Sequence, residues 1–195
     1  MKIPILATEL TAAVVRELLD YDPDTGALIW RHRARQWFAT DAVYHTWNGR
    51  RAGQPAFTAI GNHGYCTGAI LYRTYLAHRV IWLYMTGRWP RDQIDHVNHE
   101  RTDNRWCNLR AATHQQNARN VALPRNNRSG RVGVRSTRNG KFDAEIVVGG
   151  RNIRLGRFAT FTAAAAARRR AERRHGFAPT HGQARLRLSQ AEAAA

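Results

Sequence analysis

The pattern of apolar and polar residues along the chain predicts several short helices and strands. Residues 9–20 carry apolar side chains at helical spacing, which predicts an amphipathic helix. Residues 21–26 are rich in turn formers, and residues 28–30 are expected to form a strand. Residues 33–49 contain several aromatic side chains without a regular period, so this stretch is expected to be irregular.

The next part of the chain combines short strands with one helix. Glycines between residues 53 and 68 separate the strands, and residues 69–75 are expected to be the clearest of them. Residues 78–84 are apolar and bulky, and Gly87 and Pro90 close this run. A helix is therefore expected at 78–84, packed on the segment that follows.

A strand, a polar loop, a second strand and a helix are expected after it. Asp95 and His96 follow an apolar residue near the end of the first strand. Adjacent strand residues point to opposite faces, so a bulge or the strand end itself is needed for both to serve one site. Residues 109–112 can form the second strand, and Thr113 with Gln116 gives the pattern of a helix N-cap and capping box.

Residues 131–158 alternate in the manner of three antiparallel strands joined by tight turns at 139–140 and 149–150. Ile153 and Leu155 can pack inward together with Phe142. Arg151 and Arg157 lie at a two-residue period from those apolar positions, whereas Arg154 is expected to face the opposite side.

A helix is expected to follow the third strand. Thr160 or Thr162 can cap it, it runs through Ala163 to His175, and Gly176 ends it. Its run of alanines allows a close approach of helix and sheet. The polar segment 121–130 reads as a linker, and the tail from 179 to 195 is expected to be flexible.

The charge of the chain indicates which class of molecule it binds. The chain has 195 residues with 31 basic and 14 acidic side chains, which gives a formal charge of +17. Residues 121–195 contain 16 basic and 4 acidic residues, against 15 and 10 in residues 1–120. Such a field attracts polyanions, nucleic acid first and anionic membrane second, although a solvated surface is the plain alternative. All but two of the basic residues are arginine, which suits phosphate and guanine contacts but also results from a GC-rich genome.

Other global features limit the possibilities further. The length allows one ordinary domain or two small ones. No stretch approaches the ~20 apolar residues of a membrane span, and the N-terminus lacks the apolar core of a secretory signal, so an intracellular, cytoplasmic protein is expected. Cys66 and Cys107 stand far apart, so neither a disulfide framework nor a zinc site is expected.

The polar residues around position 95 suit phosphodiester hydrolysis. Asn117 lies one turn into the expected helix and is able to face back toward Asp95. Carboxylate and amide oxygens are hard ligands for Mg²⁺ or Mn²⁺. A neutral His96 can accept a proton from water near pH 7, while a metal stabilises charge on the phosphorane and on the departing oxygen.

The segment resembles the ββα-metal (His-Me finger) motif of HNH endonucleases, especially the free-standing homing type of phages and introns. The matching positions are Asp95-His96, Asp103-Asn104-Arg105, Asn108-Leu109-Arg110, Asn117 and Asn120. The resemblance implies that His96 is the general base and that Asn108 braces the loop and orients the base. It also implies that Asp95 and Asn117 hold one divalent ion.

The resemblance extends over most of residues 20–120. His78-Arg79-Val80 resembles the helix that precedes the motif in this family, and residues 21–26 and 47–49 resemble its N-terminal region. Supporting roles are implied for a wider set: His78, Arg79, Arg105, Arg110 and Asn120. A decayed fold that binds DNA without cutting it is the alternative within the family.

The C-terminal segment resembles the plant APETALA/ethylene-response-factor DNA-binding domain. Gly133-Val134, residues 155–158 and the alanine-rich helix carry the likeness. In that family the arginines of the sheet touch bases and phosphates. The DNA-contacting residues so implied are Arg131, Arg135, Arg138, Lys141, Arg151, Arg154 and Arg157. Departures at Arg135-Ser136 and Phe142 favour phosphate contact over base readout. The arginines at 168–170 and 173–174 add phosphate contacts or form a solvated helix face.

The sequence as a whole predicts an α+β protein. Residues 1–120 are expected to be the nuclease, with its ββα-metal motif at about 92–120, and residues 131–178 a three-stranded antiparallel sheet packed on one helix. The expected substrate is double-stranded DNA, without a membrane partner. A monomer would nick and a homodimer could cut both strands. A non-enzymatic DNA-binding protein and an RNA-directed protein are the alternatives.

Overall fold

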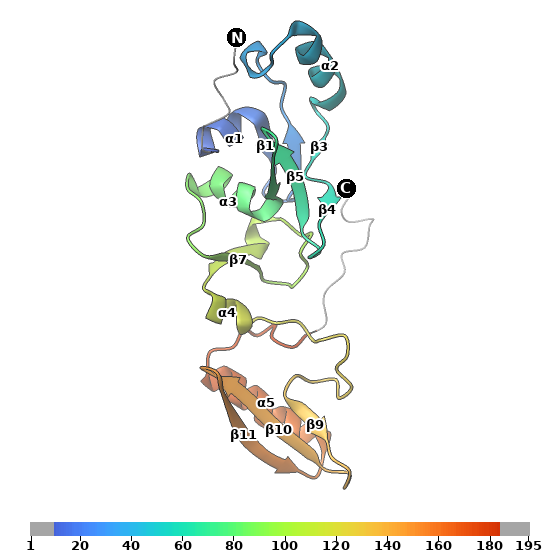
Figure 1. Cartoon of the computed structure of the whole chain (residues 1–195). Helices are drawn as coiled ribbons and strands as arrows, with labels where there is room; N and C mark the ends of the chain where they lie inside the picture. The colour runs from blue at the N-terminus through green and yellow to red at the C-terminus, as the bar shows by residue number, and fades with distance from the viewer. Residues whose placement is uncertain (1–9, 184–195) are drawn as a thin grey trace. The chain divides into compact units, whose positions relative to one another are not determined.

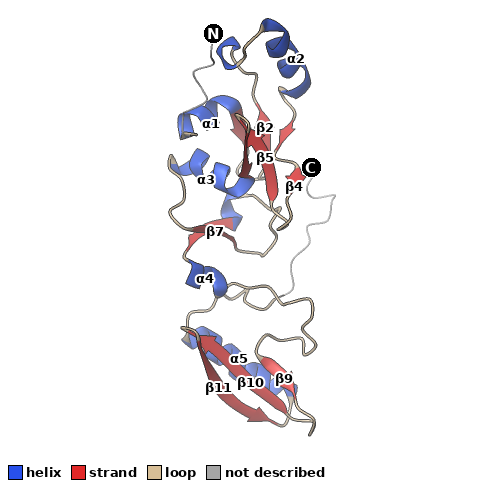
Figure 2. Ribbon diagram, in the orientation of Figure 1, coloured by secondary structure: helices blue, strands red, loops and turns tan. Residues whose placement is uncertain are grey.

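The computed structural model describes residues 10–183, which form two compact units (Figure 1). Among these residues the first unit comprises 10–96 and 100–111, and the second comprises 97–99 and 112–183. Both units combine helices with small antiparallel sheets (Figure 2). The expected α+β class is therefore confirmed.

The first unit begins with a helix and ends with the second strand of the motif. Its elements, in chain order, are α1 (Ala12–Leu18), β1 (Leu19–Tyr21), β2 (Leu28–Trp30), η2 (Arg35–Trp37), α2 (Asp41–Arg51), β3 (Pro55–Ala56), β4 (Ala59–Ile60), β5 (Cys66–Ile70), β6 (Arg73–Leu76), α3 (Ala77–Thr86), β7 (Gln93–His96), η3 (Trp106–Asn108) and β8 (Leu109–Ala112). The last residue of β8 belongs to the second unit.

Three small sheets organise this unit. Strands β1, β2 and β3 form one antiparallel sheet, and β4, β5 and β6 form another. Strands β7 and β8 pair with each other. The expected strand at 69–75 is instead two strands of a hairpin, because Leu71 and Tyr72 turn the chain with φ of +48° and +65°. Neither residue is a usual turn former, so no local sequence signal indicated this turn.

Helix α2 occupies a stretch that was expected to be irregular, so that expectation was wrong. Thr40 caps the helix by accepting a hydrogen bond from Val43 N at 3.3 Å. Its one buried side chain, Asn48, exchanges hydrogen bonds of 2.9 and 3.0 Å with the backbone of Arg33. The helix is held by this polar contact rather than by an apolar stripe, and periodicity alone does not reveal such a helix.

The core of the first unit lies between α1, α3 and the sheets. Val15, Leu18, Val80 and Ile81 are fully buried at its centre. Helix α3 ends at Gly87, which adopts φ +80° as a left-handed C-cap. Because the apolar side of α3 is fixed in this core, the helix presents His78 toward β7.

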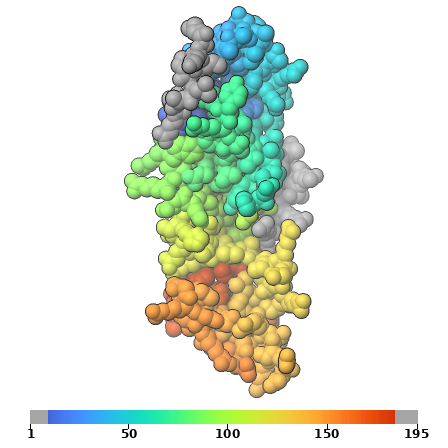
Figure 3. Space-filling view, in the orientation of Figure 1, coloured from blue at the N-terminus to red at the C-terminus, as the bar shows by residue number. Residues whose placement is uncertain are grey.

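The second unit contains α4 (His114–Ala118), β9 (Val134–Ser136), β10 (Phe142–Val148), β11 (Arg151–Phe158) and α5 (Phe161–Arg174). The strands form one antiparallel sheet in the order β11-β10-β9, and α5 packs against it. Ala144 and Ala164 are completely buried between sheet and helix. The expected three-stranded sheet on one helix is thus present. Strand β11, drawn in orange, is largely exposed on the surface of this unit (Figure 3).

A β-bulge changes which face of the sheet one arginine occupies. The register shifts at Ala144/Glu145, so Leu155 has no partner on β10 and Arg157 stands opposite Asp143. Arg157 and Arg154 both form ion pairs with Asp143, at 2.7 and 3.8 Å. The expectation that Arg157 shares the face of the inward apolar residues was therefore wrong, since the bulge moves it to the face of Arg154.

The segments on either side of the sheet are tied together. Gly182 N donates to Val121 O at 2.7 Å, and Leu123 N donates to Gln183 O at 2.9 Å. His181 is only 4% exposed. Residues 121–123 and 179–183 thus pack with the second unit, whereas the rest of the expected flexible tail, 184–195, lies outside the described residues. Helices within residues 10–183 include none long and apolar enough to cross a membrane.

Candidate active site

Strand β7 carries two buried polar side chains at its end. Asp95 is 6% exposed and His96 is 4% exposed. The strand ends at His96, which meets the condition that adjacent residues can serve one site at a strand end. Ile94, also buried, anchors the strand in the apolar core.

The His96 ring is surrounded by side chains from three other segments of the first unit. Asn104 Oδ1 lies 3.3 Å from Nε2. The rings of Tyr65 and His78 have their centroids 5.7 and 5.2 Å from that of His96. Because an amide oxygen only accepts, this contact places the imidazole proton on Nε2 and the lone pair on Nδ1.

Burial lowers the pKa of His96 below its ordinary value, although the Asn104 hydrogen bond and the charge of Asp95 oppose this effect. The imidazole is consequently neutral at pH 7. A neutral imidazole with an oriented ring is the form that can accept a proton.

Asp95 is paired with Arg110 of β8. The guanidinium Nε and Nη2 donate to Asp95 Oδ2 at 2.9 and 2.7 Å. The Arg110 side chain is 41% exposed, whereas the Asp95 side chain is 6% exposed. The Asp95 carboxylate is thus buried, whereas the Arg110 side chain extends into the solvent.

The carboxylate oxygens of Asp95 suit a hard divalent cation that is held by few protein ligands. No group of three or more His, Cys, Asp or Glu side chains that could hold a metal occurs in residues 10–183. Mg²⁺ is commonly held by one or two carboxylates, with water and substrate phosphate completing its shell. Asp95 supplies a carboxylate of this kind, so the residues present fit such an ion.

The loop between β7 and β8 is braced by its own side chains. Asn108 donates from Nδ2 to Asp103 O at 2.8 Å. Arg105 binds the buried Asp103 carboxylate through Nε and Nη2 at 2.8 and 2.6 Å. Asn108 therefore lies where it can brace the loop. Asn104 of the same loop lies within hydrogen-bonding distance of the His96 ring.

The turn at residues 22–27 supports the same loop. Tyr21 Oη donates to Asn104 O at 2.8 Å, and Trp106 N donates to Pro23 O at 2.9 Å. A Cβ on Gly26, at φ +79°, would lie 2.6 Å from Arg105 N. Only glycine allows this approach, so the turn holds the backbone beside the residue that contacts His96.

Helix α3 contributes His78 and Arg79. His78 is 4% exposed, and burial lowers its pKa to about 3, with smaller effects from His96 and Arg79. Its Nδ1 has no hydrogen-bond partner among the described residues. Arg79 Nη1 donates to Asp92 O at 3.3 Å, just before β7. His78 thus contacts β7 through the ring of His96, and Arg79 contacts the backbone just before β7.

Two residues near His96 were missed by the sequence analysis. Tyr65 precedes β5 and packs its ring against His96 and His78. The Arg101 guanidinium lies 4.8 Å from the centre of the Tyr65 ring, and its charge contributes to the lowered pKa of His96. Tyr65 is distant in sequence, so no local pattern identified it, while Arg101 stood inside the polar loop without a distinctive spacing.

Asn117 and Asn120 lie in the second unit, in and just after α4. Thr113 and Gln116 form the expected capping box at the start of this helix. Asn120 is 3% exposed, and its Oδ1 accepts from Thr180 Oγ1 at 2.6 Å and lies 2.9 Å from His99 Nε2. The Asn120 side chain therefore joins His99 to Thr180. These hydrogen bonds hold residues 97–99 and 112–120 in the second unit instead of with residues 1–96.

The predicted DNA-contacting residues of the second unit fall into two groups. Arg131 forms an ion pair with the buried Glu172 and is itself 17% exposed, so this side chain is part of the packing. The others lie on the sheet or its turns and are exposed: Arg135, Arg138, Lys141, Arg151, Arg154 and Arg157. Ion pairs with Asp143 and Glu145 engage Arg135, Arg154 and Arg157.

Comparison with known proteins agrees with this geometry. Residues 75–119 match the family of HNH endonucleases, and these residues include α3, β7, β8 and α4. This part of the chain, which holds the candidate site, is thus similar to an HNH endonuclease domain. A protein of Acanthamoeba polyphaga mimivirus named as an uncharacterized HNH endonuclease is 30% identical over 122 residues, which are 55% of this chain and 63% of that protein. The chain thus spans less than two thirds of that relative. No solved structure matches significantly.

Proposed function

We propose that the protein is a metal-dependent HNH endonuclease that hydrolyses phosphodiester bonds of double-stranded DNA. The observation that carries the proposal is a buried, neutral His96, beside a buried Asp95, inside the segment that matches the HNH family. One active site per chain cuts one strand. A monomer would therefore nick DNA, and a homodimer of the homing type would cut both strands at a preferred site.

In this proposal His96 is the general base. Asn104 holds the ring in the tautomer with the lone pair on Nδ1, and this atom takes the proton of the attacking water. The rings of Tyr65 and His78 restrict the imidazole and exclude bulk water from its sides. Asn108 keeps the loop in place through Asp103 O.

Asp95 and Asn117 are the proposed ligands of one Mg²⁺ or Mn²⁺ ion. The role of Asp95 is supported by its burial and by its hard oxygen donors. The role of Asn117 rests on the sequence motif and on its place in the capped helix α4. When bound, the ion stabilises the charge that develops on the phosphoryl oxygens and on the leaving group.

The second unit is the proposed DNA-binding part. Its sheet with one packed helix has the arrangement expected of an APETALA/ethylene-response-factor-like domain, and its exposed arginines suit phosphate contacts. Because Arg135, Arg154 and Arg157 pair with Asp143 or Glu145 on one face of the sheet, the unit is expected to contact the DNA backbone rather than to read bases extensively.

One observation favours a second function, DNA binding without cleavage. Arg110 already neutralises Asp95 through one carboxylate oxygen, and a paired carboxylate attracts a cation less strongly. In a binding protein this ion pair would persist. In an active nuclease, Arg110 would have to share or release the carboxylate for Asp95 to hold a metal ion.

The test compares three full-length proteins on supercoiled plasmid in Mg²⁺, Mn²⁺ or EDTA. These are the wild type, His96→Ala, and His45→Ala as a matched control, since His45 is an exposed histidine of α2. The proposal expects metal-dependent nicked or linear product from the wild type and His45→Ala, with loss of at least ~100-fold in His96→Ala.

The other outcomes separate the alternatives. Binding that survives EDTA, with no cleavage in any metal, would support the non-catalytic function. Faster cleavage of structured RNA than of duplex DNA would assign the activity to RNA. Cleavage by His96→Ala at the wild-type rate would remove His96 from the role of base.

A further inference from the structure

We propose that a cleft in the second unit, between the loop at 124–129 and strand β9, binds one phosphodiester anion of the DNA. The inference rests on the proposed function, because it assigns a specific phosphate contact of the same substrate. It goes beyond the arginines of the sheet face, because most of the cleft is formed by residues that neither the motif nor the sheet pattern pointed to.

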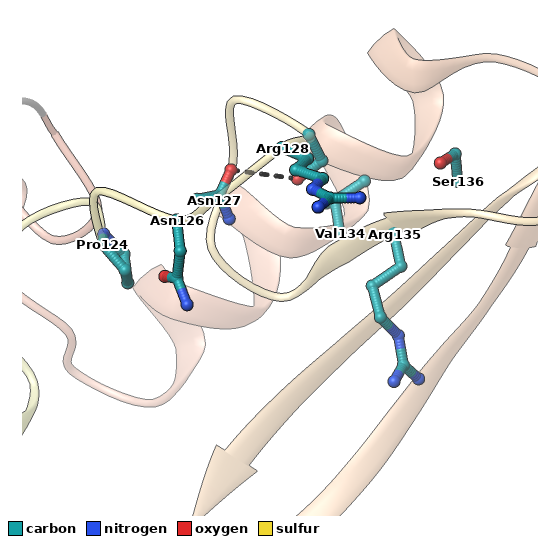
Figure 4. Close-up of a pocket in the computed structure, with 8 residues that line it drawn as sticks. Pro124, Asn126, Asn127, Arg128, Val134, Arg135 and Ser136 are labelled. Carbon is teal, nitrogen blue, oxygen red and sulfur yellow. Dashed lines mark hydrogen bonds between the residues drawn. The ribbon is translucent and has the colours of Figure 1, made fainter.

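The cleft has a volume of about 370 Å³. This is roughly ten times the ~30 Å³ that one water molecule occupies in the liquid, so it has room for a phosphate together with part of its sugar. Asn126 and Arg128 come from the loop, and Arg135 and Ser136 come from β9 (Figure 4). Buried Val134, the first residue of β9, also lines the cleft.

The donors that face the cleft are positive or neutral. Two arginines and no acidic residue line it. Among the described residues, none makes a hydrogen bond or ion pair with the side chain of Asn126, Arg128 or Ser136. Arg135 gives Nη2 to Glu145 at 3.1 Å and is 67% exposed. A guanidinium has five N–H donors, so Arg135 can serve Glu145 and an anion together.

The loop that carries Arg128 is held in shape before any ligand arrives. Asn127 N donates to Pro124 O at 3.0 Å, which closes a β-turn with Asn126 in a central position. Asn127 Oδ1 accepts from Gly130 N at 2.7 Å and from Ser129 Oγ at 3.3 Å, the latter drawn as a dashed line in Figure 4.

The same frame continues into the next residues. Asn127 Nδ2 donates to Arg131 O at 3.3 Å, and Ser129 Oγ donates to it at 2.9 Å. The side-chain oxygen and nitrogen of Asn127 are therefore both used in hydrogen bonds to residues 129–131. A loop fixed in this way loses little conformational entropy on binding, which favours a specific contact over a diffuse attraction.

The experiment measures duplex DNA binding by full-length protein in EDTA, on a His96→Ala background so that no cleavage occurs. Affinity is followed over a series of salt concentrations. Arg128→Ala is compared with Arg50→Ala, which removes the same charge from an exposed residue of α2 in the first unit. Asn126→Ala tests a cleft donor without any change of charge.

The proposal expects Arg128→Ala to weaken binding several-fold and to reduce the slope of log affinity against log salt by about 1. Arg50→Ala should leave the slope unchanged, and Asn126→Ala should weaken binding without changing the slope. Equal effects of Arg128→Ala and Arg50→Ala on DNA binding would overturn the phosphate site in the cleft while leaving the proposed function intact.

A second arm uses inorganic phosphate and follows the backbone amide signals of Asn126 and Ser136 by NMR. Saturable shifts that Arg128→Ala abolishes would support an anion site in the cleft. If none of these proteins binds DNA, the proposed function fails. Saturable phosphate shifts would then show that the cleft binds a free anion instead of a DNA phosphate. Absence of both DNA binding and phosphate shifts would overturn the cleft as well.

Discussion

Arg110 donates both of its hydrogen bonds to the same carboxylate oxygen of Asp95, with Nε and Nη2 at 2.9 and 2.7 Å from Oδ2. The carboxylate is buried and the guanidinium is half exposed. Arg110 therefore compensates the buried charge of Asp95, and it sets the charge that an entering cation would meet. This relationship connects the stability of the fold to the proposed metal site.

Replacing Arg110 with alanine is expected to make folding depend more strongly on metal. The buried Asp95 loses its cation partner, so the free energy of unfolding in EDTA should fall by about 1–3 kcal/mol. Mg²⁺ should restore more stability to Arg110→Ala than it adds to the wild type. Urea unfolding with Mg²⁺ or EDTA measures both effects. Arg73→Ala, on the exposed strand β6, is the control, and an equal Mg²⁺ effect in all three proteins would contradict the prediction.

Substitutions of Asn104 are expected to move the pH dependence of cleavage in opposite directions. The Asn104 hydrogen bond raises the pKa of His96 against the larger lowering by burial. Activity falls as pH drops through this pKa, because the protonated ring is no longer a base. Asn104→Asp adds a negative charge and should shift the acidic limb of the kcat profile to higher pH, whereas Asn104→Ala should shift it to lower pH. Identical acidic limbs in both variants would show that Asn104 does not act on the base.

Removing the Tyr21 hydroxyl is expected to weaken the support of the loop between β7 and β8. Burial is the main reason that the pKa of Tyr21 is raised, and its hydroxyl donates to Asn104 O at 2.8 Å. Tyr21→Phe leaves that buried carbonyl without this donor, so thermal or urea unfolding should show a loss of about 1–3 kcal/mol. Tyr72→Phe is the matched control, since Tyr72 is 92% exposed, and should change stability by no more than about 0.5 kcal/mol.

His78 is expected to make stability depend on pH. Its pKa is about 3 in the folded protein and ~6.5 in an unfolded chain. The unfolded state therefore binds a proton first, so stability is full above about pH 6.5 and is lost as pH falls toward 3, on the order of 1 kcal/mol per pH unit. His78→Phe keeps the ring packing and should flatten this dependence between pH 7 and 5. A variant whose unfolding free energy falls as steeply as that of the wild type would assign the loss to other groups.

Much of the fold followed from local sequence signals. Strand β2 at 28–30, strand β8 at 109–112 and the capping box at Thr113 lie where they were predicted. These elements have strong local signals, either an apolar run or a capping pair. Helix α2 was missed because its stabilising contact, Asn48 with Arg33, is polar and spans 15 residues.

The bulge at Leu155 shows a second kind of limit. Two-residue alternation predicts faces correctly only while the register is continuous. Beyond the bulge every side chain changes face, so Arg157 was placed on the wrong side. Similarly, the partner of Arg131 is Glu172, 41 residues later, and no alternation within the strand could show that this arginine is part of the packing.

The candidate site could be predicted in part. Asp95 and His96 are neighbours in sequence, so their proximity was certain and only their burial remained to be found. Tyr65, His78 and Tyr21 reach the same region from elements far away in the chain. Their contacts depend on how α3 and the small sheets pack, which sequence spacing does not encode.

The most direct test of the central claim, that His96 is the base, is chemical rescue of His96→Ala by imidazole. Cleavage of supercoiled plasmid is followed in Mg²⁺ under single-turnover conditions, with and without added imidazole. The account predicts a loss of about 10²- to 10⁴-fold in the variant, and a recovery that increases with imidazole concentration. A variant that cuts DNA as fast as the wild type without imidazole would contradict it.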